Sequence, residues 1–175
     1  DIDLQGAMTA NSGAGDVTIS ATGNRSVYLG GAQNPLGLSL SGAELQYITA
    51  KNFTLESGKG GTGSRGITVD GISATDSGNI GTVILNAVTD PYVSGSNPRI
   101  AFTANPSTFK ALEVRADAGV VFNTNVTTTV GNFLVESDQN HTGESFDDTV
   151  VKGGITLTAA GRLTIEQGLH FGSSS

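Results

Sequence analysis

The chain has 175 residues, a formal net charge of −7, 25 glycines and no cysteine, which is the length of one domain with a hydrophobic core. Its nine lysines and arginines are scattered singly, so we expect no basic surface for the phosphates of nucleic acid or of an anionic membrane. No apolar run approaches the ~18 residues that a membrane-spanning helix needs, so we also expect no membrane insertion.

A five-residue pattern recurs along the chain: apolar, any, apolar, any, then small or polar. Such alternation, bounded by Gly, Asn, Asp or Ser, is typical of short strands with one buried face. It predicts strands over residues 17–21, 53–57, 67–71, 83–87, 100–104, 112–116, 120–124, 133–137, 155–159 and 163–167, with a further strand-like stretch at 169–171. We expect the first and third residues of each strand to point into the core.

One segment predicts a helical turn instead of a strand. Ser41 and Glu44 have the spacing of a capping box, in which the hydroxyl and the carboxylate each accept a hydrogen bond from the other residue's amide. Leu45 and Ile48 follow on one face of this turn. We therefore expect a short helix beginning after Ser41.

The predicted strands occur in similar couplets. Residues 112–122 share their pattern with residues 155–165, and their separation divides into two periods of about 21 or 22 residues, which is typical of solenoids. Stacked hairpins would instead place Asn-Gly or Asp-Gly between adjacent strands, and Asp70-Gly71 is the only such pair. We predict an all-β fold, a right-handed parallel β-helix (β-solenoid) that residues 1–175 form as a single segment, with an antiparallel β-sandwich as the alternative.

Residues 37–45, Gly-Leu-Ser-Leu-Ser-Gly-Ala-Glu-Leu, lead into Ile-Thr-Ala at 48–50 and Phe-Thr-Leu at 53–55. This stretch resembles the repeats of filamentous-haemagglutinin-like large exoproteins, the secreted surface proteins of Gram-negative bacteria that are exported by two-partner secretion. The Asn-Pro-Asn-Leu type of signature found in their secretion domain is reduced here to Asn-Pro-Leu at 34–36. The resemblance therefore implies the repeat shaft of a longer repetitive protein rather than its secretion module.

The same resemblance implies a structural or adhesive role. The segment would form a rigid shaft or filament outside the cell, at the cell surface, and would present side chains for contact with cells or surfaces. The implied partners are further copies of the chain, end to end or laterally, and host or neighbouring cell surfaces or their glycans. The absence of cysteine fits an exported protein, and we predict no enzymatic activity and no cofactor.

The alternative function is that of a carbohydrate-active β-helix, either a polysaccharide lyase or hydrolase or a glycan-binding module. Enzymes that cleave polysaccharides use carboxylates a few ångströms apart. The fourth strand positions, expected to point outward along one sheet, hold Glu56, Glu136, Glu166 and Asp70. A row of like charges commonly protects strands from aggregation, and three tyrosines without tryptophan offer little for sugar stacking. We therefore predict no catalytic residues.

Two further motifs are weak. The loop from residue 138 to residue 148 contains four carboxylates that could ligate a hard cation, Asp138, Glu144, Asp147 and Asp148. Because neither EF-hand spacing nor a calcium-roll repeat occurs there, we expect a solvated acidic loop without metal.

Residues 58–63 satisfy the glycine motif G-x-G-x-x-G. A nucleotide-binding motif of this kind requires a helix after it, but a strand is predicted there. We therefore predict no bound nucleotide.

Overall fold

The computed structural model describes residues 2–23, 25–32, 34, 36–59, 65–88, 98–141 and 147–172. Within them the chain is all-β, with one 3-10 turn and one short α-helix. Every pair between described strands is parallel. These pairs contradict the alternative of an antiparallel sandwich. None of the described helices is long and apolar enough to cross a membrane.

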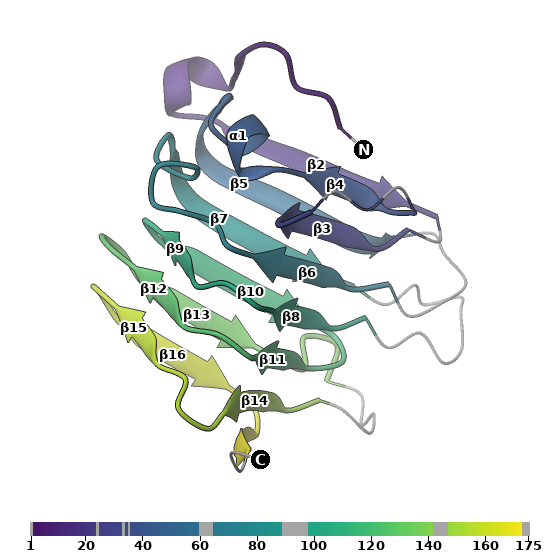
Figure 1. Ribbon diagram of the computed structural model, residues 1–175, viewed down its shortest axis with the longest axis vertical. Coiled ribbons are helices and arrows are strands. Elements are labelled where there is room, and N and C mark those ends of the chain that lie inside the picture. Colours follow the sequence, from purple (N-terminus) through teal and green to yellow (C-terminus); the bar gives the residue numbers. More distant parts are fainter. Residues whose placement is uncertain are drawn as a thin grey trace.

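The strands belong to three sheets (Figure 1). The first sheet contains β1 (Met8–Thr9), β2 (Asp16–Thr22), β5 (Ile48–Lys59), β7 (Ile80–Ala87), β10 (Leu112–Ala116), β13 (Phe133–Glu136) and β16 (Leu163–Glu166). The second contains β3 (Val27–Gly30), β4 (Leu38–Leu40), β6 (Ile67–Asp70), β8 (Ile100–Phe102), β11 (Val120–Phe122), β14 (Thr149–Lys152) and β17 (Leu169–Gly172). The third contains β9 (Ser107–Phe109), β12 (Val126–Thr128) and β15 (Leu157–Ala159), and the helical turns are η1 (Asn11–Gly13) and α1 (Gly42–Leu45).

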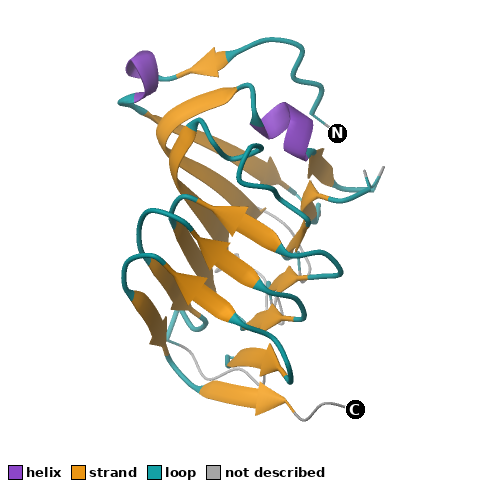
Figure 2. Ribbon diagram, turned by 60° about the vertical axis from the view of Figure 1, so that its left-hand side comes forward, coloured by secondary structure: helices purple, strands orange, loops and turns teal. Residues whose placement is uncertain are grey.

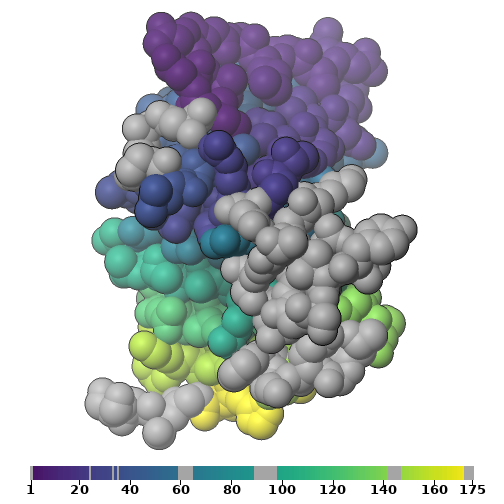
Figure 3. Space-filling view, turned by 90° about the vertical axis from the view of Figure 1, so that its right-hand side faces the viewer, coloured from purple at the N-terminus to yellow at the C-terminus, as the bar shows by residue number. Residues whose placement is uncertain are grey.

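The chain visits the sheets in turn. It passes from β7 of the first sheet to β8 of the second, then to β9 of the third, and returns to the first sheet at β10, where the next coil begins. The same sequence of sheets repeats from β10 to β13 and from β13 to β16. Figures 2 and 3 show the coils following one another along the long axis, from the N-terminal to the C-terminal end. This stacking of parallel strands is consistent with the predicted β-solenoid.

The coils differ in length. Stacked outward residues are 21 positions apart at Arg115 and Glu136 but 30 apart at Asn132 and Arg162, so the predicted period holds for one coil and not for the next. The couplets that indicated the period compare β10 in the first sheet with β15 in the third, and these strands do not pair. All strands show the same alternation of inward and outward residues, whichever sheet they belong to. The sequence pattern therefore could not tell which strands pair with one another.

The core lies between the three sheets. As predicted, the first and third residues of the strands point inward, and those of the predicted strands from Phe53 to Val135 are buried. At its centre the ring of Phe122 stacks on that of Phe102 with centroids 4.9 Å apart, and meets the ring of Phe133 edge-on at 5.9 Å. One apolar interior therefore runs continuously through successive coils.

Several strands were not predicted. Strand β3 satisfies the same five-residue pattern, with Val27 and Leu29 buried, and the pattern could have identified it. Strands β9 and β14 place Ser107 and Thr149 at buried inward positions, so a polar residue stands where the pattern requires an apolar one. An interior that tolerates small polar residues at its corners hides such strands from a search for alternating hydrophobicity.

Residues at the N-terminal end cross the stack of coils and cover it (Figure 2). The amide of Ile2 donates to the carbonyl of Ser39 on β4 at 3.1 Å, and the amide of Leu4 donates to the Glu44 carboxylate at 3.4 Å. The side chains of Leu4 and Met8 pack against the core. The N-terminal segment therefore occupies part of the edge that β4 would otherwise offer to another strand.

Candidate functional site

The outer face of the first sheet carries a cluster of charged side chains, Glu113, Arg115 and Glu136. Parallel pairing places outward residues of successive strands in columns. One column contains Ser20, Glu56, Asn86, Arg115, Glu136 and Glu166. The neighbouring column contains Thr18, Thr54, Ile84, Glu113, Leu134 and Thr164. This face is the place where paired carboxylates of a carbohydrate-active β-helix would lie.

Arg115 joins two of the carboxylates on this face. Its Nη1 atom lies 2.9 Å from Oε2 of Glu136 on the next coil, and its Nη2 atom lies 3.0 Å from Oε2 of Glu113 on its own strand. Its Nε atom donates to the same Glu113 oxygen at 3.3 Å. Both carboxylates therefore share one guanidinium, an arrangement that ties adjacent coils together and offsets the repulsion between the acids.

Glu56 is held in a similar way nearer the N-terminal end. The hydroxyl of Ser20 donates to its Oε2 atom at 2.6 Å, and the side-chain amide of Asn86 donates to its Oε1 atom at 3.4 Å. These partners lie on the strands on either side, β2 and β7. Side-chain hydrogen bonds thus cross three of the five strand interfaces in this column, those from β2 to β5, from β5 to β7 and from β10 to β13.

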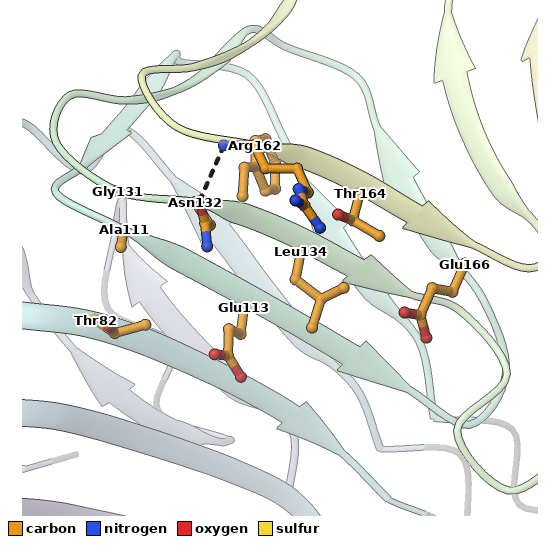
Figure 4. Close-up of a pocket in the computed structure, with 10 residues that line it drawn as sticks. Thr82, Ala111, Glu113, Gly131, Asn132, Leu134, Arg162, Thr164 and Glu166 are labelled. Atoms are coloured by element: carbon orange, nitrogen blue, oxygen red, sulfur yellow. Dashed lines mark hydrogen bonds between the residues drawn. The ribbon is translucent and has the colours of Figure 1, made fainter.

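A shallow hollow of about 510 Å³ lies on the same face, toward the start of the strands (Figure 4). Arg162, just before β16, and Thr164 of β16 border it on one side. Glu113 and Thr82 border it on the opposite side, and Leu134 lies between them. The side chain of Asn132 accepts a hydrogen bond from the backbone amide of Arg162 at 2.9 Å, which fixes the entry into β16. The hollow offers one cation, carboxylates and hydroxyls around an aliphatic side chain, which suits contact with a polar chain such as a glycan.

The predicted row of outward carboxylates is correct in part. Glu56, Glu136 and Glu166 share one column of the first sheet. Asp70 does not, because its strand, β6, belongs to the second sheet. There its Oδ1 atom accepts hydrogen bonds from the amide and the side chain of Asn105, at 2.9 and 3.0 Å. The sequence could not assign Asp70 because the strands of both sheets obey the same alternation.

The acidic loop is described only in part. Glu144 lies outside the described residues. The Oδ2 atom of Asp148 lies 3.3 Å from Nε2 of His170, and the carbonyl of Asp138 accepts a hydrogen bond from the amide of His141. Within the described ranges no three His, Asp or Glu side chains are grouped to hold a metal ion. The described part of the loop thus gives no support to the candidate cation ligands Asp138, Asp147 and Asp148.

The glycine-rich motif begins in a strand. Gly58 belongs to β5, and residues 60–64 lie outside the described part of the chain. The backbone of Gly58 has a φ of +94°, and a Cβ there would overlap the carbonyl oxygen of Val88 in the next coil. Strand β6 follows the motif, as predicted. Close stacking of coils therefore explains this glycine without a phosphate ligand.

The predicted capping box is confirmed at α1. The Ser41 hydroxyl accepts from the amide of Glu44 at 3.2 Å, and the Glu44 carboxylate accepts from the amide and the hydroxyl of Ser41 at 2.8 and 2.7 Å. Burial by itself raises the pKa of Glu44. The hydrogen bonds from Ser41 and from the amide of Leu4 outweigh burial and hold this pKa below its usual value.

A second box of the same form lies one coil away and was not predicted. The Ser73 hydroxyl accepts from the amide of Asp76 at 3.2 Å, and the Asp76 carboxylate accepts from the amide and the hydroxyl of Ser73 at 2.8 and 2.7 Å. Burial by itself raises the pKa of Asp76. The hydrogen bonds from Ser73 and from Gln46 outweigh burial and hold this pKa below its usual value. The Gln46 side chain, 2.9 Å from Asp76, links the two corners. The Ser-x-x-Asp spacing was the signal that could have revealed this box.

No model of a known protein family, no curated protein and no solved structure matches this chain. Function must therefore be argued from the fold and from the outer face of the first sheet.

Proposed function

We propose that this chain is a segment of right-handed parallel β-helix that acts as a rigid, non-enzymatic shaft in a secreted bacterial surface protein. Crossovers between parallel strands are right-handed in about 98% of cases, which supports the proposed handedness. The resemblance to the repeats of filamentous-haemagglutinin-like exoproteins supports the location and the bacterial origin. In this role the chain holds binding surfaces at a distance from the cell and presents the outer face of its first sheet to other cells or to their glycans.

The observation that carries this proposal is the continuous parallel pairing from β2 to β16. Each interior coil is hydrogen-bonded to a coil on either side, and its apolar side chains fill a common interior. A load along the axis is therefore shared by every backbone ladder that joins two coils. Such a stack is stiff because each coil has a fixed neighbour on both sides.

The arrangement of the outer carboxylates favours a shaft over a polysaccharide-cleaving enzyme. Glu113 and Glu136 share Arg115, and Glu56 accepts hydrogen bonds from two neighbouring coils. General acid and base residues must lie within hydrogen-bond reach of the proton that they transfer to or from a substrate. Carboxylates that join coils are better explained as lateral ties between coils. Glu166 lies beside only one of these carboxylates, Glu136.

Adhesion by the outer face can be tested with the chain displayed on beads. We expect the beads to be retained by bacterial or epithelial cells, or by immobilised glycans, and soluble chain to compete with them. Leu134→Glu introduces a charge into the hollow and is expected to reduce retention several-fold. Val130→Glu is the matched control, because Val130 is an apolar residue that is 71% exposed and does not line the hollow.

Three results would each contradict a part of the proposal. Retention that is absent on every cell and glycan surface would exclude the adhesive role. Depolymerisation of an acidic polysaccharide, abolished by Glu136→Gln in a variant that melts at the wild-type temperature, would establish the carbohydrate-active alternative. Experimental density that shows left-handed winding would refute the proposed handedness alone.

A further inference from the structure

The hollow on the outer face of the first sheet contains two small residues, Ala111 and Gly131, which lie just before β10 and β13. A Cβ added at Gly131 would lie 2.8 Å from the Cβ of Ala111. A side chain at Gly131 would therefore crowd Ala111 within the hollow. The volume of about 510 Å³ lies in the range of about 300–1,000 Å³ that is typical of small-molecule sites.

Asn132 presents a hydrogen-bond donor to this hollow. Its Oδ1 atom accepts a hydrogen bond from the backbone amide of Arg162 at 2.9 Å. Because that amide can only donate, the contact fixes which atom of the Asn132 side chain is oxygen and which is nitrogen. The Nδ2 atom then points away from the amide of Arg162 and into the hollow (Figure 4), where it has no acceptor among the described residues.

Glu113 presents an acceptor to the same hollow. Arg115 contacts only the Oε2 atom of Glu113, which lies 3.0 Å from Nη2 and 3.3 Å from Nε. The Oε1 atom therefore remains for another donor. The side chain of Glu113 is 34% exposed, so a ligand in the hollow can reach this carboxylate.

Leu134 lies between the donor and the acceptor. It pairs with Glu113 on β10 and with Thr164 on β16, and it follows Asn132 by two residues on the same face (Figure 4). Adjacent strands are about 4.8 Å apart, and alternate residues of one strand are about 6.6 Å apart. A donor, an apolar side chain and an acceptor are thus grouped within a few ångströms of one another.

An acetamido group requires these three contacts. Its carbonyl oxygen accepts a hydrogen bond, its N–H group donates one, and its methyl group is apolar. Nδ2 of Asn132 matches the carbonyl, Oε1 of Glu113 matches the N–H group, and Leu134 matches the methyl group. The guanidinium of Arg162 and the hydroxyl of Thr164, which also line the hollow, match the hydroxyls of a sugar ring.

We propose that the hollow binds an N-acetylhexosamine residue of an uncharged glycan. This inference rests on the proposed adhesive function, and it names the sugar that the outer face recognises. Three carboxylates and two guanidiniums lie on this part of the face, those of Glu113, Glu136, Glu166, Arg115 and Arg162. Because the whole chain also has a net charge of −7, its field disfavours an acidic glycan.

A peptide fits the hollow less well than a sugar. Peptide recognition draws its specificity from pockets for side chains. Among the residues that line the hollow, Leu134 is the one large apolar side chain that points outward. Hydroxyl, amide and charged groups surround it, and these match the hydroxyls of a sugar ring.

Three tetrasaccharides that differ only at C2 test the inference. The tetramer of β-1,4-linked N-acetylglucosamine carries acetamido groups, the corresponding glucose tetramer carries hydroxyls, and the deacetylated tetramer carries ammonium groups. Each is titrated into the 175-residue chain and followed by nuclear magnetic resonance. The acetylated tetramer should bind about tenfold more tightly than the other two, because only it uses both hydrogen bonds and the apolar contact. The largest shifts should occur at residues 131–134.

Asn132→Asp is the sharpest variant, because it keeps the oxygen that accepts the amide of Arg162 and removes the Nδ2 donor. It should weaken binding of the acetylated tetramer by about tenfold without lowering the melting temperature. Asn125→Asp is the matched control: Oδ1 of Asn125 accepts from the amide of Thr156 at 2.7 Å, and Asn125 does not line the hollow. It should bind like wild type. Leu134→Ala should weaken binding of the acetylated tetramer several-fold and that of the glucose tetramer less.

Several results would overturn the inference. These are equal affinities for the acetylated and glucose tetramers, tighter binding of the deacetylated tetramer, or an Asn132→Asp variant that binds like wild type. An equal loss in Asn125→Asp would do the same. N-acetyl-tetraglycine amide that binds as tightly as the acetylated tetramer would identify a site for peptide instead. If beads that carry the chain are still retained by cells or by other glycans, the adhesive function stands and only this choice of sugar fails.

Discussion

Phe122 provides the most direct test of the packing on which the shaft depends. Its ring contacts that of Phe102 from the preceding coil and that of Phe133 from the following coil, and all three side chains are fully buried. Phe122→Ala removes contacts from three coils and leaves a cavity. Substitutions of this kind cost about 3–5 kcal/mol. Because two ring pairs are lost as well, we expect a decrease of about 4 kcal/mol in the free energy of unfolding.

The measurement is urea unfolding followed by far-ultraviolet circular dichroism, with hydrogen exchange to detect coils that open separately. Val121→Ala is the matched control, because Val121 is the adjacent residue of β11 and points outward. Its expected cost is below about 1 kcal/mol. Equal midpoints for the two variants would refute a continuous interior at this position, since only one of them removes a ring from between the sheets.

Three further substitutions test the ties and corners of the stack. Arg115→Ala should lower the free energy of unfolding by about 1 kcal/mol at low salt and less at high salt, because it removes the guanidinium that pairs with two carboxylates. Lys51→Ala is the control. A loss of stability that does not depend on salt would argue against the ion pairs. The lowered pKa of Glu44 means that its contribution to stability is complete above the unfolded pKa of about 4.3 and is lost as the pH falls through the lower folded pKa. The melting temperatures of wild type and Glu44→Gln should therefore converge in acid, and a constant difference would contradict this. Gly58→Ala should lower the free energy of unfolding by more than about 1 kcal/mol, because Gly58 has a positive φ and a Cβ there clashes with the next coil. Gly6→Ala, at an open position, should change the free energy of unfolding by less than about 0.5 kcal/mol. Similar melting temperatures for both variants would refute the close approach of Gly58 to the next coil.

The candidate site was predictable where it depends on strand alternation alone. That alternation correctly indicated that Glu56, Glu136 and Glu166 point outward. It could not place Glu113 and Arg115 in the same cluster as Glu136, because their contact depends on which coil follows which and on a separation of 21 residues that the next coil does not repeat. Alignment of strands in space is set by loop length, and loop length varies from coil to coil.

The strand-forming segments, the inward and outward faces and the capped turn after Ser41 could be identified from the amino-acid order, because each follows from residues close together in the chain. Only the tertiary structure assigned strands to sheets, separated Asp70 from the other outward acids and revealed the polar inward positions of β9 and β14. These features depend on contacts between coils, and a local pattern of alternation is the same whichever coil lies beside it.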